Sequence, residues 1–173
     1  MTRAVVDIPV IETERLILRA PREADFGAFA AFGASDRAHW VGGPYSRPRA
    51  WGGFLATLGH WMLRGYGMWI LEERETGAPA GRVGMIFNDG WDEPELGWQI
   101  FDGFKGRGLA FEAACAARSH AATNQGLDGV ISYIAPDNTR SRALAARLGA
   151  VHEGDSTLHG QPVEIHRHPK EAA

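Results

Sequence analysis

The chain has 173 residues, of which 45% are hydrophobic and 23% are charged, and its formal net charge is −3 at pH 7. This length suits one globular domain, and the charge excludes broad binding to nucleic acid or anionic membranes, which needs a basic excess. The lone cysteine, Cys115, excludes an intrachain disulfide and favours a reducing, cytoplasmic setting, and no apolar run predicts a transmembrane helix or signal peptide.

Patterns of apolar and turn residues divide the chain into alternating strands and helices. In chain order, we predict a strand at 15–19, helices at 22–34 and 47–64, strands at 68–72, 82–87 and 95–101, a helix at 108–124, a strand at 130–134, a helix at 138–148, and strands at 151–156 and 162–167. A turn-rich loop at 39–45 separates the first two helices. This order predicts a single α/β domain over 1–173, with its core at 13–168 and a mixed, mostly antiparallel twisted sheet of about seven strands flanked by about four helices.

A glycine-rich segment, 105–110, lies between the strand at 95–101 and the helix at 108–124. Glycines at a helix start leave backbone N–H groups uncovered, and the helix dipole adds partial positive charge, so the segment predicts a phosphate site. Phe111 stands where a dinucleotide-binding loop needs a third small residue, and Lys105 precedes both glycines, unlike a Walker loop. Two interpretations are left: a site for the pyrophosphate of a longer cofactor, and a helix start that uses glycine only for a tight turn.

A second motif, Pro136-Asp137-Asn138-Thr139-Arg140-Ser141, leads from the strand at 130–134 into the next helix. Together with the opening at 13–19, the run at 95–98, the glycine loop and Leu148-Gly149, it resembles the GNAT acetyltransferase superfamily. Within that superfamily, the chain is similar to the branch that acetylates the N-termini of ribosomal proteins. The resemblance covers nearly the whole chain, although its glycine loop begins with lysine where the family has glutamine or arginine.

The resemblance implies acetyl-CoA as the donor. The pyrophosphate is then expected on the loop amides, and the pantetheine arm along the backbone of the strand at 95–101, which splays from the strand at 130–134 to admit it. The expected cofactor-binding residues are Trp98, Gln99, Ile100, Gly106, Arg107, Gly108, Leu109, Ala110, Phe111, Asn138 and Ser141. Asn138 also suits a plain helix N-cap and Ser141 a first-turn cap. Arg140 and Arg142 either meet phosphates or are solvated.

Acetyl transfer to an amine requires a neutral amine, a polarised thioester carbonyl and a proton for the leaving thiolate. Many relatives carry a tyrosine acid where this chain has Ala145, and some carry a glutamate base where it has Tyr133. The catalytic candidates are therefore Glu95 as base, Ser141 near the thiolate and Tyr133 as another proton carrier. Glu95 also suits an exposed charge at a strand end. An α-amine, with a pKa of about 8, is easier to deprotonate than a lysine at about 10.4.

The resemblance places four ring-bearing residues of loops near the thioester, as candidates for the acceptor pocket: His39, Trp40, Tyr45 and Trp91. Such residues also cover the edges of cores. His166 and His168 lack a ligand set at metal-binding spacing, so no metal site is expected.

The leading functional hypothesis is an acetyl-CoA-dependent N-acetyltransferase that acts on a primary amine in a ternary complex. The acceptor is a peptide or protein N-terminus, or else a small amine such as a polyamine or an aminoglycoside. The alternatives are a non-catalytic acyl-CoA-binding module and a structural domain without a cofactor. Nucleic acid and membranes are not expected partners, and the sequence leaves monomer or homodimer open.

Overall fold

A computed structural model of the chain describes residues 6–171, so the ends of the predicted domain, 1–5 and 172–173, lie outside the described residues. Its strands form one sheet in the order β1-β2-β3-β4-β5-β6-β8-β7. The strands are β1 Ile11–Glu12, β2 Leu16–Arg19, β3 Met68–Glu73, β4 Pro79–Ile86, β5 Glu95–Ile100, β6 Ile131–Ile134, β7 Val151–Leu158 and β8 Gln161–Arg167. The prediction of a mixed, mostly antiparallel sheet is confirmed, since only β5 and β6 pair in parallel. The short β1 adds an eighth strand.

Four α-helices and two 3-10 helices accompany the sheet within residues 6–171. They are η1 Glu23–Asp25, α1 Phe26–Ala34, η2 Asp36–Val41, α2 Arg47–Arg64, α3 Leu109–Asn124 and α4 Thr139–Arg147. The predicted helix at 22–34 is divided into η1 and α1, and the prediction of a loop at 39–45 is wrong for residues 39–41. These residues continue η2, which ends where Gly42 takes a left-handed φ of 84° and donates its N–H to the carbonyls of Ala38 and His39. None of these helices is both long and apolar enough to cross a membrane.

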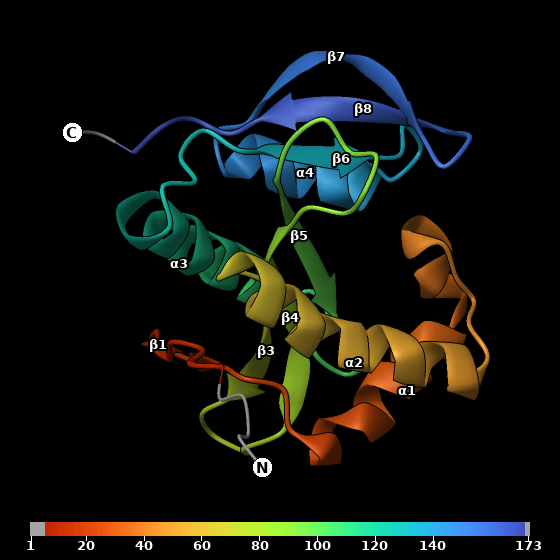
Figure 1. The fold of residues 1–173 in the computed structure, drawn as a ribbon, viewed down its shortest axis with the longest axis vertical. Helices are drawn as coiled ribbons and strands as arrows, with labels where there is room; N and C mark the ends of the chain where they lie inside the picture. The colour runs from red at the N-terminus through yellow and green to blue at the C-terminus, as the bar shows by residue number, and fades with distance from the viewer. Residues whose placement is uncertain (1–5, 172–173) are drawn as a thin grey trace.

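The splay predicted beside the fourth expected strand is confirmed. β4 and β5 pair along the whole of β5, whereas β5 and β6 share only the partners Glu95 and Ile131. Beyond this point β5 leaves β6, so the backbone groups of its second half have no strand on that side. In Figure 1, β5 connects a lower part, which contains β1–β4 and α1–α3, with an upper part that contains β6–β8 and α4.

Two apolar clusters hold these parts in place. The larger cluster packs the small side chains of α3, such as Ala113 and Ala117, against β-strand residues such as Val83 and Leu96. Alanine on this face lets the helix lie close to the sheet, which fixes the position of its N-terminus. The smaller cluster joins α1 and α2 to the end of β5 through phenylalanines and alanines. Both clusters therefore brace β5, the strand at the centre of the candidate site.

Candidate active site

The glycine loop has the conformation that its sequence requires. Gly106 and Gly108 have φ angles of 74° and 77°, in the left-handed region that side chains disfavour. Gly108 is the N-cap of α3, and the first three amides of the helix, Leu109 to Phe111, donate to no acceptor among residues 6–171. The loop therefore presents free N–H groups at the positive end of a helix, which suits an anion such as a phosphate.

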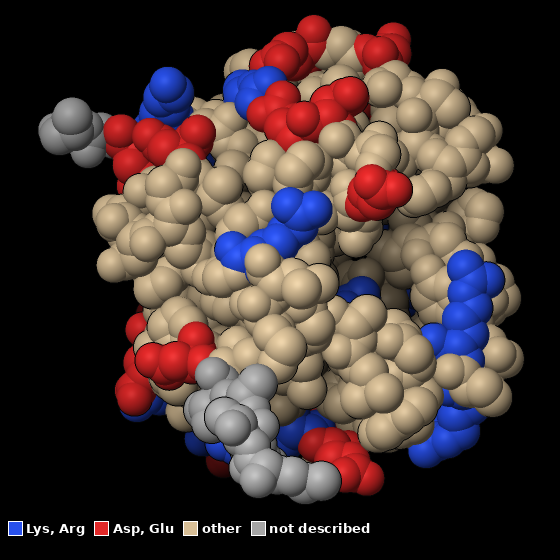
Figure 2. All heavy atoms as spheres, viewed as in Figure 1, with Lys and Arg blue, Asp and Glu red and all other residues tan. Residues whose placement is uncertain are grey.

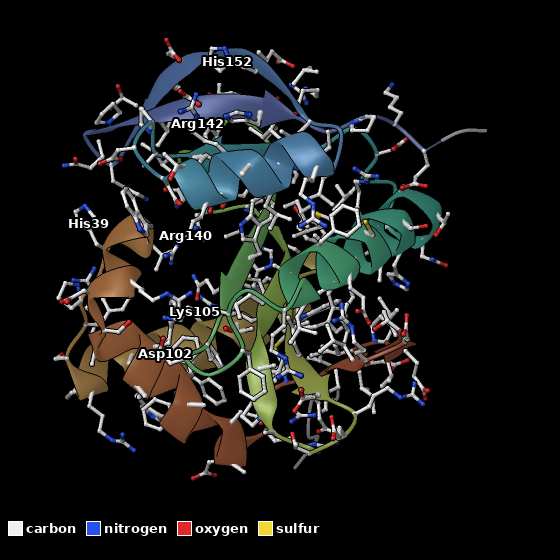
Figure 3. The ribbon with its side chains drawn as sticks, turned by 180° about the vertical axis from the view of Figure 1, so that it is seen from behind. His39, Asp102, Lys105, Arg140, Arg142 and His152 are labelled. Atoms are coloured by element: carbon white, nitrogen blue, oxygen red, sulfur yellow. The ribbon has the colours of Figure 1, made fainter. Side chains whose placement is uncertain are left out.

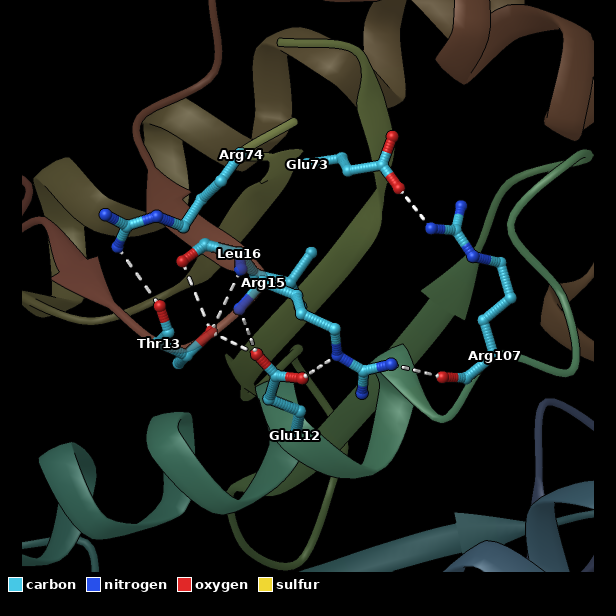
Figure 4. Close-up of polar contacts among 7 residues, drawn as sticks. All are labelled: Thr13, Arg15, Leu16, Glu73, Arg74, Arg107 and Glu112. Atoms are coloured by element: carbon cyan, nitrogen blue, oxygen red, sulfur yellow. Dashed lines mark hydrogen bonds and ion pairs between the residues drawn. The ribbon is translucent and has the colours of Figure 1, made fainter. Parts of the chain in front are cut away.

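The loop is held from behind by a polar network that the sequence analysis missed (Figure 4). Arg15 donates from Nη1 to the carbonyl of Arg107 at 2.7 Å and from Nε to Glu112 at 2.7 Å. Glu112 also accepts from the Thr13 hydroxyl at 2.6 Å, and the Arg107 guanidinium pairs with Glu73. Thr13 and Arg15 belong to the opening motif of the resemblance, but nothing in the sequence indicated that this motif meets the loop. The Arg107 side chain is thus anchored to the sheet, while its backbone stays in the loop.

Glu112 is the centre of this network. Burial favours the neutral carboxyl, but hydrogen bonds from Thr13 and from the backbone and side chain of Arg15 outweigh it and lower the pKa of Glu112 below its ordinary value. The carboxylate therefore stays ionised at neutral pH and ties the loop to the N-terminal segment of the chain.

The splayed gap between β5 and α4 brings together Trp98, Asn138 and Ser141. The Asn138 amide oxygen accepts the Ser141 N–H at 3.2 Å, so Asn138 does cap α4. The Trp98 indole donates to the Ser141 hydroxyl at 3.2 Å across the gap. The Ser141 oxygen is an acceptor in this bond, so its own proton is available to another group. The two helix arginines differ: Arg142 pairs with Glu164 at 2.9 Å, whereas Arg140 is exposed.

Glu95 lies at the one point where β5 and β6 pair, and it is buried, with 9% of its surface exposed. Its position contradicts the interpretation as an exposed charge at a strand end. One carboxyl oxygen accepts the Tyr133 backbone N–H at 2.8 Å. Burial raises the pKa of Glu95 to about 8, although that hydrogen bond acts in the opposite direction. The carboxyl can therefore exchange a proton near neutral pH, as a general base must.

Tyr133 neighbours Glu95 on β6, and its ring contacts Trp91. The Tyr133 hydroxyl points toward Asp92, at 3.5 Å, rather than toward the Glu95 carboxyl. Burial raises the pKa of Tyr133, so its phenol stays neutral at pH 7. The rings of Tyr133 and Trp91 meet edge to face, 5.5 Å apart. The structure thus places one predicted pocket residue, Trp91, against Tyr133, whose backbone N–H donates to the predicted base.

The other three predicted pocket residues lie on η2 and just after it. His39 and Trp40 are exposed neighbours, and Tyr45 is half-buried with its hydroxyl donating to the Val41 carbonyl. In Figure 3, His39 on η2, Arg140 on α4 and Lys105 in the glycine loop come from three segments around the gap between the two parts of the molecule. Figure 2 views the molecule from the opposite side to Figure 3. It shows a hollow in the surface, with basic side-chain atoms at its floor.

Gln99 has a partner that the sequence analysis did not predict. Its side-chain oxygen accepts from Nε of Arg82, at 2.7 Å, from the facing position on β4. Arg82 looked like an ordinary charge at the start of a predicted strand, and no local signal distinguished it. Among residues 6–171, no three His, Cys, Asp or Glu side chains gather into a group that could hold a metal.

Comparison with known proteins agrees with this arrangement. The family model "Acetyltransferase (GNAT) domain" matches residues 15–151. A crystal structure of an acetyltransferase from Agrobacterium tumefaciens is 36% identical, with a TM-score of 0.87 over 98% of this chain and 99% of that one. The [ribosomal protein uS5]-alanine N-acetyltransferase of Escherichia coli is 26% identical over 83% of this chain and 79% of its own length.

A third relative shares the fold at lower identity. The structure of the ribosomal L7/L12 α-N-protein acetyltransferase RimL in complex with coenzyme A is 19% identical, with a TM-score of 0.78 over 95% of this chain and all of that one. The family model covers most of the chain, including the glycine loop, β5 and Ser141. The chain therefore belongs to the GNAT family of acetyltransferases.

Proposed function

We propose that this acetyltransferase moves the acetyl group of acetyl-CoA to the α-amine of a peptide or protein N-terminus. The observation that carries the proposal is the buried Glu95 carboxyl, with its pKa near 8, at the point where β5 and β6 separate. A base of this strength matches an α-amine, whose pKa is also about 8, better than a lysine side chain. The related Escherichia coli enzyme is named for an N-terminal alanine acceptor, which supports the same class.

The donor site would consist of the glycine loop and the splayed gap. The loop amides from Gly106 to Phe111 would hold the pyrophosphate of acetyl-CoA at the N-terminus of α3. The free backbone of Trp98, Gln99 and Ile100 would pair with the pantetheine arm as a further strand would. Asn138 and Ser141 would border the arm from α4. The coenzyme A complex of RimL supports a nucleotide thiol as the ligand of this fold.

The reaction would be direct attack in a ternary complex. Glu95 takes a proton from the acceptor ammonium, directly or through a water, and the neutral nitrogen attacks the thioester carbonyl. Backbone N–H groups of β5 near Trp98 polarise that carbonyl. The C–N bond forms and the C–S bond breaks. The Ser141 hydroxyl, which the Trp98 indole holds in place, gives its proton to the leaving thiolate and takes the second proton that the nitrogen releases, while Glu95 passes the first proton to solvent. Tyr133 is the alternative proton carrier, by way of its hydroxyl near Asp92.

Two other functions compete with this proposal. A small-molecule amine would use the same donor site, and an acyl-CoA-binding module would use it without turnover. The ionisable Glu95 favours an enzyme over a module, since binding alone does not require a buried carboxyl. A ribosomal-protein acceptor would also agree with the cytoplasmic setting favoured by the lone cysteine.

Release of free thiol from acetyl-CoA tests the proposal. The full chain is assayed with alanine- and serine-initiated peptides, the same peptides with blocked N-termini but a free lysine, a polyamine and an aminoglycoside. We expect turnover with the free α-amines only. Turnover with only the polyamine or the aminoglycoside would refute a peptide acceptor and indicate a small-molecule amine instead. Coenzyme A at ~100 times its Kd should stabilise the fold by about 2.7 kcal/mol. Stabilisation without any turnover would favour the binding module, and no stabilisation would refute the donor site.

A further inference from the structure

Arg82 on β4 is a half-buried cation that has no carboxylate at ion-pair distance among residues 6–171. Among residues 6–171, every other arginine without a carboxylate at ion-pair distance is exposed, whereas Arg82 is half-buried. The exposed ones are Arg47, Arg49, Arg64, Arg140 and Arg147. A buried charge ordinarily has a partner, because taking it out of water is costly. Arg82 therefore needs an explanation that the others do not.

The surroundings of Arg82 orient its guanidinium but do not neutralise it. Nε donates to the Gln99 side chain at 2.7 Å, and Nη1 lies 3.5 Å from the Thr57 hydroxyl of α2. The guanidinium lies over the ring of Phe29 of α1, 4.8 Å from its centre. All three partners are uncharged. They fix a planar donor fork and leave its Nη2 without an acceptor among residues 6–171, although that atom is not fully enclosed.

Tyr45 is the titratable group whose charge would act on this fork, and it cannot serve as the missing anion. Burial raises the pKa of Tyr45, although the arginines near it act in the opposite direction, so the phenol is neutral at pH 7. Its hydroxyl donates to the Val41 carbonyl. Burial also lowers the pKa of Arg82 to about 10, which leaves the guanidinium charged at neutral pH.

Arg82 shares a face of the sheet with Glu95. On β5, Glu95, Gly97 and Gln99 alternate with residues of the opposite face, and Arg82 is the Cα partner of Gln99. The Glu95 carboxyl leans over Gly97, since a Cβ there would lie 3.7 Å from Oε1. Glu95 and Arg82 thus lie on the same face of the sheet, and Gly97, which has no side chain, lies between them. Glu95 and Gln99 are four residues apart, about 13 Å along a strand.

We propose that Arg82 is a subsite for a carboxylate of the acceptor, so that the preferred acceptor is a peptide with an acidic residue directly after its N-terminus. The inference rests on the proposed function, because it takes Glu95 as the end at which the amine reacts. Both side chains are long, and their reach shortens the distance of about 13 Å between the two strand positions, so an acidic side chain at the second position of an extended peptide can span what is left. A guanidinium binds a carboxylate through two parallel hydrogen bonds, which selects it over an amide. Polyamines and aminoglycosides lack such a group and are disfavoured here.

Two peptides that differ by one functional group test the inference. They begin Ala-Asp and Ala-Asn and are otherwise identical. A charge-assisted hydrogen bond contributes about 1.5–3 kcal/mol, so we expect wild-type kcat/KM to favour the aspartate peptide at least tenfold. In Arg82→Gln the preference should fall below about threefold, and Arg82→Lys, which keeps the charge but lacks the fork, should be intermediate. Arg64→Gln is the matched control, because Arg64 also stacks on a ring, that of Phe87, but is exposed on α2.

A second measurement does not depend on turnover. The N-acetylated forms of both peptides are titrated into the complex with coenzyme A and followed by thermal shift. If neither peptide is acetylated but the acidic product binds better through Arg82, the proposed reaction fails and the subsite is upheld. If both peptides are acetylated equally well and both products bind alike, the subsite is refuted and the reaction is upheld. A preference that survives in a folded Arg82→Gln variant would also overturn the assignment.

Discussion

The two ends of the candidate site are built in different ways. The proposed donor end is local, because the amides expected to bind the pyrophosphate come from one segment, Gly106 to Phe111, whose glycines set the backbone. The proposed acceptor end is assembled from β4, β5 and β6, and its groups Arg82, Glu95 and Tyr133 come into one region only through strand pairing. A ligand bound by backbone therefore leaves a pattern in the sequence, whereas a ligand bound by side chains from several strands leaves almost none.

The largest effect should come from the acceptor end. A general base contributes about 10²–10⁴-fold, so Glu95→Gln should reduce kcat at least 100-fold. The Kd for coenzyme A should stay within about twofold, because the change lies outside the donor end. Asp89→Asn, which alters an exposed carboxylate nearby in the sequence, is the control. A Glu95→Gln variant with wild-type turnover would remove Glu95 from the mechanism.

The pH dependence of kcat sharpens the same prediction. Glu95 must lose its proton to act as a base and has a pKa of about 8, so the rate should rise as the pH rises through 8. The acceptor amine also titrates in this range, so two peptides with different α-amine pKa values are compared. The part of the pH profile that is due to Glu95 should have the same apparent pKa with both peptides, and it should be absent in Glu95→Gln. A profile with only one apparent pKa, which shifts with the α-amine pKa of the peptide, would contradict an ionising Glu95.

The donor end should respond to a change that alters only the backbone. Alanine at Gly108 must adopt a φ of 77° and approach Arg15, whose Nη2 would lie 3.5 Å from the new Cβ. A left-handed alanine costs about 1–2 kcal/mol, so we expect a roughly tenfold weaker affinity for coenzyme A as the loop shifts. Gly160→Ala is matched in φ, also 77°, and has open space in the β7–β8 hairpin. Equal losses of affinity in both variants would mean that the loop geometry is not the cause.

The network behind the loop should affect stability before it affects catalysis. Glu112→Gln removes charge-assisted hydrogen bonds from Thr13 and Arg15, which should lower the free energy of unfolding by about 1 kcal/mol at pH 7. The pKa of Glu112 is lowered in the fold, so its contribution is present above the carboxyl's unfolded value and is lost as the pH falls through the folded one. Urea unfolding at pH 7 and pH 3.5 measures this. A difference that persists undiminished at the lower pH would exclude an ionic role.

The smallest effect is expected where the two ends meet. Ser141→Ala removes the proposed proton donor and leaves the Trp98 indole without its partner, but water can replace the hydroxyl in the half-buried gap. We expect a fall in kcat of about threefold to tenfold, near the loss of one ordinary hydrogen bond. Ser156→Ala on β7 is the control. A loss as large as that of Glu95→Gln would mean that thiolate protonation limits the rate.

The sequence patterns predicted the order of the main elements, and the resemblance implied the splay beside β5. Other features were not predicted. The sequence left Glu95 open between a base and an exposed charge, because the pattern of a strand end does not reveal what covers it. No sequence pattern assigned a role to Arg82, because its hydrogen-bond partner Gln99 lies 17 positions further along the chain. The sequence also placed Arg107 in a loop, without its anchor at Glu73 or the support of Arg15. In each case the missing information was a contact between distant segments.

By itself, the sequence determined the fold class and the conformation of the glycine loop, because glycine conformation, helix capping and apolar periodicity act over a few residues. Its resemblance to the GNAT superfamily predicted the donor, acetyl-CoA. Only the tertiary structure decided how deeply Glu95 is buried, which groups surround Arg82 and what supports the loop from behind. The physical reason is that desolvation and charge pairing depend on every atom within a few ångströms, whichever part of the chain supplies it.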